Sequence, residues 1–259
     1  MGAHVPGVDP LAEAEVLGAD CVQIFLSDPQ SFRKPAPRPD AEALRASSLP
    51  IYVHAPYLIN VCSPAPNRRY GGRKILQQTC EAAEEIGAAA VIVHGGHAED
   101  DVREGFGRWK RTLEQLKTTV PLYIENTAGG RNAVARRFED LAGLWEAVTS
   151  ASTTVPLGFC FDTCHAHAAG EELSDAVERV LEIVGRIDLL HANDSLGEFG
   201  SGRDRHVSPG RGKIGPELMR HMIAAAGAPV VIEPYDAAGA SPEDVKTDIA
   251  FVREALAAG

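Results

Sequence analysis

Short apolar segments alternate with helix-patterned segments along the whole chain, and this alternation limits the possible folds more than any other feature. The apolar segments are rich in Val, Ile and Leu and mostly lack a polar–apolar repeat, which is typical of parallel strands buried on both faces. We predict eight strands, over residues 2–5, 21–26, 51–54, 90–94, 122–125, 157–162, 187–193 and 230–233. We predict eight helices, over residues 11–17, 41–47, 74–86, 105–116, 138–147, 175–184, 216–226 and 244–257.

A regular βα alternation is compatible with a closed barrel or with an open, doubly wound sheet. Eight units in 259 residues match the usual size of a (β/α)8 TIM barrel. A dinucleotide-binding sheet is disfavoured, because Gly7 stands alone where that fold has a glycine-rich turn. We therefore predict a single TIM-barrel domain over residues 1–259, with an extended surface loop at residues 27–40 after the second strand.

The composition indicates a globular protein, since 44% of the residues are hydrophobic and 24% are charged. No apolar run approaches the ~20 residues of a membrane helix, and the N-terminus has neither the basic start nor the apolar core of a secretory signal. We therefore expect no membrane association and a cytoplasmic location. The cysteines form no CxxC pair, which argues against disulfides and against a thiolate zinc site; they are Cys21, Cys62, Cys80, Cys160 and Cys164.

Histidine and carboxylate residues gather at the carboxyl ends of the predicted strands and in the loop after the seventh strand. In a βα barrel these ends surround one mouth, so residues far apart in sequence come within reach of a common ligand. Any one of them alone would more often be a capping or buried hydrogen-bonding group. Together, four carboxylates and five imidazoles around one cavity require cations that offset desolvation and repulsion. They are His54, His94, Glu125, Asp162, His165, His191, Asp204, His206 and Glu233.

Imidazole and carboxylate ligands without thiolates favour zinc over manganese or iron. Nine ligands exceed what one ion uses, because a structural zinc takes about four and a catalytic zinc about three plus water. We therefore predict two or three ions that share bridging carboxylates. Three Zn²⁺ ions carry six positive charges against four carboxylates, so the centre would keep a formal charge of +2 and attract an anion such as phosphate.

The net charge of −11 argues at first against a nucleic-acid partner, because DNA affinity depends largely on Lys and Arg. The basic residues are unevenly placed, however. Fourteen Lys/Arg and only five Asp/Glu lie in the predicted loops at residues 27–40, 55–74, 126–137 and 194–215, a local balance of +9 that leaves −20 for the rest. These loops border the mouth of the predicted barrel, so a DNA duplex across it is electrostatically favourable.

Several segments of the chain carry a family resemblance, above all YIENTAGG and FDTCHAHAAG. The others are GAHV, VHAPYLIN, VIVHGGH, HANDS, GSGRDRH and the VIE at residues 231–233. Over nearly its whole length the sequence resembles the endonuclease IV family of apurinic/apyrimidinic endonucleases. The resemblance implies three zinc ions per chain, held by His54, His94 and Glu125, by Glu125, Asp162, His191 and Glu233, and by His165, Asp204 and His206.

The same resemblance implies a reaction. The expected activity is hydrolysis of the phosphodiester on the 5′ side of an abasic site in duplex DNA, as in base excision repair, leaving a 3′-OH and a 5′-deoxyribose phosphate. Removal of blocking groups from 3′ ends would use the same geometry. Glu125 and Glu233 are the expected catalytic carboxylates: Glu125 bridges and orients, and Glu233 assists deprotonation of the attacking water. The resemblance also implies a monomer.

Tyr57 and Leu58 match the family's loop that inserts into the minor groove beside the lesion. Aromatic and apolar wedges of this kind bend DNA at unstacked steps. The second loop departs from the family pattern, because Asp28 and Phe32 stand where the family usually has Asn and Trp. A separate departure follows Glu233, where Pro234 stands in place of the family's common Thr. The remaining expected DNA contacts are Gln30, Arg33, Asn126, Arg203 and Arg205.

Two alternative functions are compatible with parts of this pattern. A sugar isomerase or epimerase of the xylose isomerase-like barrels needs only Glu125, Asp162, His191 and Glu233 around one or two divalent ions, and it would leave the other five side chains without a purpose. A non-catalytic DNA-lesion binder that kept the fold is the other alternative. A count of about three zinc ions per chain would distinguish the nuclease from the isomerase.

Four histidines lie outside the predicted ligand set. We expect His4, on the first strand, beneath the cluster as a core residue or an orienting partner of a ligand. His97 and His167 stand close to predicted ligands and are the alternatives to His94 and His165 as metal ligands. His221 falls on a predicted outer helix and is expected at the surface.

Overall fold

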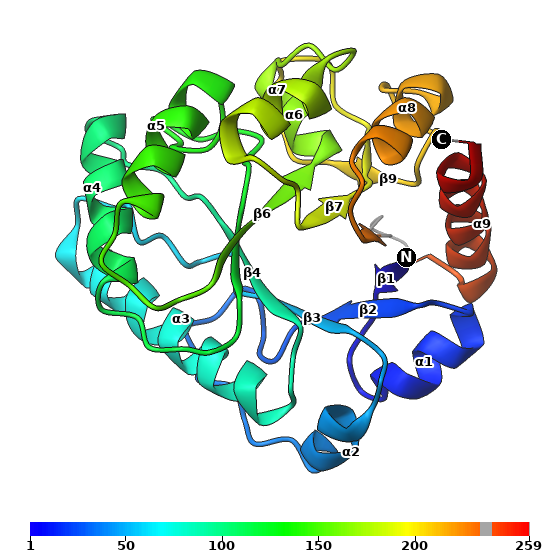
Figure 1. Ribbon diagram of the computed structural model, residues 1–259, viewed down its shortest axis with the longest axis horizontal. Coiled ribbons are helices and arrows are strands. Elements are labelled where there is room, and N and C mark those ends of the chain that lie inside the picture. Colours follow the sequence, from blue (N-terminus) through cyan, green and yellow to red (C-terminus); the bar gives the residue numbers. More distant parts are fainter. Residues whose placement is uncertain (234–239, 259) are drawn as a thin grey trace.

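Eight parallel strands close into a barrel in the computed structural model, which describes residues 1–233 and 240–258. Neighbouring strands follow the order β1-β10-β7-β6-β5-β4-β3-β2, and the helices surround them (Figure 1). The prediction of a single (β/α)8 TIM barrel is therefore confirmed. Pro234, noted above as a departure from the family pattern, lies outside the described residues. The strands are β1 (Gly2–His4), β2 (Cys21–Ile24), β3 (Ile51–His54), β4 (Ala90–His94), β5 (Leu122–Glu125), β6 (Leu157–Asp162), β7 (Leu189–His191) and β10 (Val230–Ile232).

The interior of the barrel is filled by a small apolar cluster that forms a floor under the strand ends. Tyr52, Cys160 and Leu189 belong to this cluster and each precedes a predicted ligand by two residues. Because strand side chains alternate between the two faces, residues two apart share a face, so the ligands point into the barrel above this floor. The complete cluster is Cys21, Tyr52, Ala90, Ile92, Cys160, Leu189 and Val231.

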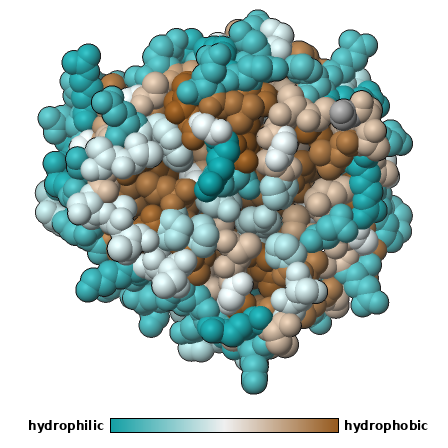
Figure 2. Space-filling model, viewed as in Figure 1, coloured by the Kyte–Doolittle hydropathy of each residue, from teal (hydrophilic) through white to brown (hydrophobic). Residues whose placement is uncertain are grey.

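The outward-facing strand residues pack against a ring of helices, which forms the larger core of the molecule. Figure 2 shows hydrophilic side chains around the rim of the molecule and hydrophobic ones nearer its centre. Among the described residues, no helix combines the length and apolar character that a membrane crossing requires. The helices are α1 (Pro10–Leu17), α2 (Ala41–Ala46), α3 (Pro66–Glu85), α4 (Val102–Leu113), α5 (Phe138–Thr149), α6 (Thr163–Ala169), α7 (Ala176–Val184), α8 (Pro216–Ala225) and α9 (Pro242–Ala258).

Helix α3 begins at Pro66, eight residues before the predicted start at residue 74. Glycines have low helix propensity, so the pair Gly71 and Gly72 argued against a helix in this segment. The structure explains Gly72 by a close approach, since a Cβ atom there would lie 3.2 Å from the backbone nitrogen of Asn60. Pro66 is suited to the first helical turn, where its missing N–H has no intrahelical partner.

Two elements near the barrel mouth were absent from the sequence prediction. Helix α6 follows β6 directly, with Asp162 as its N-cap. The predicted strand at residues 187–193 is shorter than expected, because β7 ends at His191 and a separate two-stranded antiparallel sheet follows. That sheet pairs β8 (Asp194–Ser195) with β9 (His206–Val207). Both elements carry residues of the predicted metal centre.

Trp109 of α4 links the outer ring to the barrel mouth, and its substitution tests this link. It is fully buried, and its Nε1 donates a 2.6 Å hydrogen bond to the carbonyl of Gly95, the residue after His94. Trp109→Phe leaves that buried carbonyl with only the weak thiol donor of Cys62, whose Sγ lies 3.3 Å away, so we expect a loss of about 1–3 kcal/mol in the free energy of unfolding, measured with urea. Trp145→Phe is the control, because Trp145 is only partly buried against the core. An equal loss in both variants would contradict this role of the hydrogen bond.

Candidate metal centre

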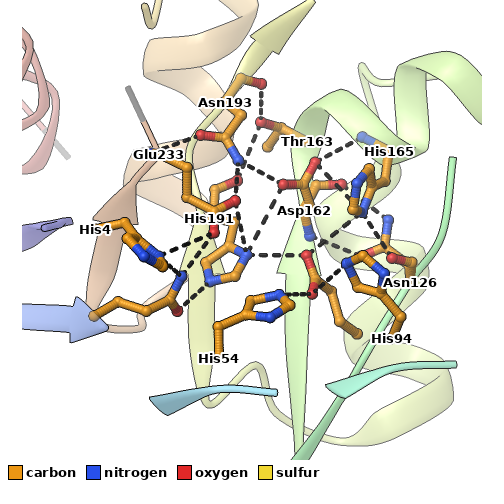
Figure 3. A network of polar contacts seen from close by, with 12 residues as sticks. His4, His54, His94, Asn126, Asp162, Thr163, His165, His191, Asn193 and Glu233 are labelled. Carbon is orange, nitrogen blue, oxygen red and sulfur yellow. Dashed lines mark hydrogen bonds and ion pairs between the residues drawn. The ribbon is translucent and has the colours of Figure 1, made fainter. Parts of the chain in front are cut away.

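Neighbouring strands bring the predicted ligands together in pairs. His94 of β4 is the register partner of Glu125 of β5, and Asp162 of β6 is the register partner of His191 of β7. The structure gathers all nine predicted side chains at the carboxyl ends of the strands, and Figure 3 shows six of them by label within one network of polar contacts. What these side chains bind stays a prediction.

Glu125 lies at the centre of the cluster and is fully buried. Its Oε2 atom lies 3.2 Å from Nε2 of His54 and 3.3 Å from Nε2 of His94. Its Oε1 atom lies 2.9 Å from Nδ1 of His191 and 3.4 Å from Nδ1 of His165. The two oxygens of one carboxylate therefore face different groups of imidazoles, which is the arrangement that a bridging ligand requires.

A second group surrounds the other oxygen of Glu125. The potential ligand atoms of Glu125, Asp162, His191 and Glu233 all lie within 4.8 Å of one another. His191 Nδ1 is 3.5 Å from Glu233 Oε2 and 3.9 Å from Asp162 Oδ2. All four residues are buried, so this group is the most enclosed part of the centre.

A third group lies towards the open side of the mouth. Asp162, His165 and His206 form one set of potential ligand atoms within 4.8 Å of one another. Asp204 contacts both imidazoles, with Oδ2 3.2 Å from His165 Nε2 and Oδ1 2.8 Å from His206 Nε2. Its side chain is 47% exposed, which makes Asp204 the most accessible of these carboxylates. Asp162 thus stands between the second and third groups as Glu125 stands between the first and second.

Local structure explains how Asp162 and His165 come to face one another. Asp162 ends β6 and caps α6, where its Oδ1 accepts a 2.6 Å hydrogen bond from the backbone N–H of His165. An aspartate at this position satisfies an N–H that has no intrahelical partner. The first turn of α6 therefore projects His165 over the cluster. The loop between β8 and β9 supplies Asp204, and β9 itself supplies His206.

Backbone carbonyls fix the orientation of two of the imidazoles. The Nδ1–H of His54 donates to the carbonyl of Ala55 at 2.8 Å, and the Nδ1–H of His165 donates to the carbonyl of Asn126 at 2.8 Å. In both rings the proton on Nδ1 leaves the lone pair on Nε2, which faces a carboxylate of the centre. Such outer hydrogen bonds set the tautomer of a metal-binding histidine.

Two asparagines orient the carboxylates. Asn126, predicted as a DNA contact, is instead buried, and its side-chain amide donates to the carbonyl of Asp162 and accepts from its N–H. We therefore assign Asn126 to positioning Asp162. Asn193 was not singled out in the sequence, although it belongs to the HANDS segment. Its Nδ2 donates to Asp162 Oδ2 at 2.6 Å and to Glu233 Oε2 at 3.0 Å.

The acidic surroundings favour protonated imidazoles in the metal-free chain. Burial alone lowers the pKa of His191, but the acidic groups around it outweigh this effect and raise the pKa well above 6.5. Burial is likewise outweighed at His165, where Asp162 and Asp204 raise the pKa, and at His206, where Asp204 contributes most. Protons therefore occupy positions from which a metal ion would displace them.

The carboxylates respond in two ways. Burial opposes the ionisation of Glu125 and Glu233, yet the neighbouring imidazoles, His191 first among them, outweigh it. They hold the pKa of Glu125 well below normal and lower the pKa of Glu233 to about 2. At Asp162 burial dominates and the pKa is raised. The pKa values of the carboxylates therefore depend on burial and on the charge of the neighbouring imidazoles together.

The donor set fits a metal ion. The Nε2 atom of His206 is buried and, within the described part of the chain, has no hydrogen-bond partner in good geometry, although Asp204 lies close to it. A metal ion would satisfy this nitrogen. The sequence prediction set cysteines aside, but the sulfur atoms of Cys160 and Cys164 lie within ligand range of the second and third groups. Burial raises the pKa of Cys160 to about 12, which keeps it a thiol and favours the imidazoles and carboxylates as ligands.

A cavity of about 560 Å³ opens beside the ligands. His94, His165 and Asp204 form part of its wall, and Tyr57 and Leu58 line it from the loop after β3. Tyr57 and Leu58 are 43% and 41% exposed, so both present apolar surface next to the centre. The remaining predicted DNA contacts apart from Asn126 lie at the surface, partly or fully exposed; they are Gln30, Arg33, Arg203 and Arg205.

Not every basic residue of the rim is available to a phosphate. Arg38 is paired with Asp40, and Arg69 donates to the carbonyls of Ser63 and Pro64. Arg137 donates to the carbonyl of Gly170 and is paired with Glu171. The positive charge counted in the sequence therefore includes arginines that hold the loops in place, which reduces the number that face a ligand.

Comparison with known proteins identifies the family. Residues 11–255 match the family model described as "Xylose isomerase-like TIM barrel". The chain is 56% identical over 256 residues to "Probable endonuclease 4" of Mycobacterium tuberculosis (strain ATCC 25177 / H37Ra), with 98% of both chains covered. Its fold matches the crystal structure of endonuclease IV from Thermus thermophilus with a TM-score of 0.82 and 30% identity, covering 100% of this chain and 99% of that one.

The chain belongs to the endonuclease IV family. It is therefore a hydrolase of the nuclease type with a role in DNA repair, and members of the endonuclease IV family depend on metal ions. The fold alone is more widely shared: a "D-tagatose 3-epimerase-like protein" matches with a TM-score of 0.76 at 20% identity, covering 99% of this chain and 97% of that one. Within the endonuclease IV family the ligand cluster, rather than the barrel, carries the chemistry.

The other histidines of this endonuclease IV family member take different places. His4 lies beneath the cluster, where burial lowers its pKa to about 3. His97 lines the cavity, and its side chain is 43% exposed. The Nε2 of His167 lies 3.1 Å from the carbonyl of Gly197, which places it in the support of the loop between β8 and β9. His221 of α8 is exposed, as predicted.

The protonation of the metal-free centre predicts that zinc binding releases protons. His165, His191 and His206 have pKa values above the usual 6.5, so their protons stabilise the metal-free fold below about pH 6.5, and this contribution is lost as the pH rises through the raised values. We expect zinc affinity to rise with pH, and calorimetry in two buffers of different ionisation enthalpy at neutral pH to show proton release. His206→Gln should reduce that release, whereas His221→Gln should leave it unchanged. Zinc binding without proton release would contradict this account.

Proposed function

We propose that the chain is a zinc-dependent endonuclease that hydrolyses the phosphodiester 5′ to an abasic site in duplex DNA. The products would be a 3′-OH and a 5′-deoxyribose phosphate, and the same site would clean blocked 3′ ends. The observation that carries the proposal is the position of Glu125, whose two oxygens face separate imidazole groups; one imidazole of each group, His94 and His165, lines an open cavity. We further propose that the protein acts as a cytoplasmic monomer.

The residues would hold three ions in three overlapping sets. Zn²⁺, when bound in such a site, supplies a water of lowered pKa and positive charge that stabilises a phosphate in its transition state. The sets are His54, His94 and Glu125; Glu125, Asp162, His191 and Glu233; and His165, Asp204 and His206. Asp162 also groups with His165 and His206, and its Oδ2 lies 3.9 Å from His191 Nδ1 and 3.8 Å from His206 Nε2, so Asp162 adjoins the third set as well.

Glu125 and Glu233 would have the catalytic roles among the protein's own groups. Glu125 orients the first two sets relative to one another through its two oxygens. Glu233 is ionised at neutral pH, which is the form that accepts a proton from an attacking water. Its Oε2 lies 3.0 Å from Asn193 Nδ2 and 3.6 Å from His206 Nδ1, so the carboxylate is held with one oxygen towards the centre.

The rim would bind the DNA. Arg33, Arg203 and Arg205 are exposed on loops around the mouth and would contact phosphates, together with the polar Gln30. Tyr57 and Leu58 stand at the edge of the cavity, where an aromatic and an apolar side chain would fill the gap left by the missing base. Selectivity for abasic sites would follow, because an intact base pair leaves no such gap.

A sugar isomerase or epimerase is the second candidate, because the set Glu125, Asp162, His191 and Glu233 is complete without the others. The five further side chains favour the nuclease. They would have no role around one divalent ion, yet they all make contacts within the same cluster. His54 and His94 contact Glu125, and His165 and His206 contact Asp204.

Incubation of the zinc-loaded protein with a duplex that carries one abasic analogue tests the proposal. We expect a single nick 5′ to the analogue, resolved on a denaturing gel. Glu125→Gln should lower the nicking rate by at least about 100-fold, because it alters a ligand shared by two sets. Glu182→Gln makes the same chemical change on the exposed face of α7 and should have no effect. Ketose–aldose interconversion without nicking would overturn the proposal.

A further inference from the structure

Gln23 is a buried polar residue that neither the sequence analysis nor the proposed reaction uses. It lies on β2 in register with His4 of β1, and no part of it is exposed. Its Oε1 lies 2.8 Å from Nε2 of His191, and its Nε2 lies 2.6 Å from Oε1 of Glu233 and 3.1 Å from Nδ1 of His4. One side-chain amide therefore touches two of the four members of the second ligand group from below.

The contact with Gln23 fixes which nitrogen of His191 carries a proton. An amide oxygen only accepts hydrogen bonds, so Nε2 of His191 must donate. The lone pair of the neutral ring is then on Nδ1, which faces Glu125 Oε1 at 2.9 Å. His54 and His165 are held in the opposite sense, through Nδ1 and a backbone carbonyl. A side chain therefore fixes the tautomer of His191, whereas backbone carbonyls fix the tautomers of His54 and His165.

The same amide selects which oxygen of Glu233 faces the centre. The N–H of Gln23 occupies Oε1 of Glu233, and Oε2 remains on the side of Asn193 and His191. Figure 3 shows His4, His191 and Glu233 lying together at this edge of the network. Without the amide, Nε2 of His191 loses this acceptor, and the carboxylate of Glu233 is held from the side of Oε2 but loses its donor at Oε1.

An uncharged glutamine side chain can make all three of these contacts, to His191, Glu233 and His4. It offers one acceptor oxygen and two N–H donors, which match His191, Glu233 and His4 in that order. A methionine of similar length offers neither a comparable acceptor nor a donor. An ionised glutamate would place a second negative charge against Glu233 and could not donate to it.

We propose that Gln23 is a positioning residue that sets the tautomer of His191 and the orientation of Glu233, and thereby the affinity of the second ligand group for its metal ion. This role depends on the proposed metal binding at Glu125, Asp162, His191 and Glu233. Gln23 itself is not a ligand, because its amide atoms are already engaged by His191, Glu233 and His4.

Gln23→Met tests the role, and Gln77→Met is the matched control. Gln77 of α3 also donates and accepts through its amide, to and from the backbone of Lys117, but it lies on the outer ring. We expect Gln23→Met to weaken the binding of one zinc ion by about 10–100-fold in competition with a chelator and to leave the other sites unchanged. Gln77→Met should bind like the wild type. Wild-type affinity at every site in a folded Gln23→Met protein would overturn the role.

A measurement on the unmodified protein does not depend on the folding of the variant. In zinc-loaded protein labelled with ¹⁵N-histidine, long-range ¹H–¹⁵N correlation should show His191 protonated at Nε2 and unprotonated at Nδ1. A proton on Nδ1 would overturn the proposal. A wild-type protein that binds no zinc would refute the metal centre itself, whereas zinc binding that is unaffected by Gln23→Met would refute only the role of Gln23.

Discussion

The burial of three carboxylates among five imidazoles at one end of a barrel, with the more exposed Asp204 beside them, is the constraint on which the rest of the structure depends. Glu125 has no exposed surface, and it is tolerated because imidazoles face both of its oxygens. In the metal-free chain, the raised pKa values of His165 and His191 favour protons that supply the opposing charge, and metal ions would replace those protons. Burial of these charged groups costs free energy unless each group is held against its partner. The asparagine, glutamine and backbone hydrogen bonds around the ligands hold them in this way.

The closed barrel supplies that rigidity. Parallel strands in register set His94 beside Glu125 and Asp162 beside His191, and the apolar interior cluster supports them from below. Loops and short elements then complete the centre from above, since α6 carries His165 and the loop between β8 and β9 carries Asp204. The second group is enclosed because its residues lie at buried strand ends. The third group is more open because Asp204 lies on a loop at the surface.

Much of this architecture could be predicted from the sequence. Strand positions followed from continuous apolar runs, and a chain of alternating βα units places His54 and Glu233 at one rim although they lie far apart in sequence. Other features could not be predicted, because they depend on contacts between distant segments. The role of Gln23 depends on strand pairing across the barrel, and the burial of Asn126 depends on how its loop returns to Asp162. Helix α6 is too short for its periodicity to be recognised.

The central claim is that these nine side chains hold several metal ions in overlapping sets. Anomalous diffraction from zinc-loaded crystals, recorded on both sides of the zinc absorption edge, tests it most directly. We expect three separate peaks, two of them flanking Glu125 and the third between His165 and His206. A single peak among Glu125, Asp162, His191 and Glu233, or none at the strand ends, would contradict it.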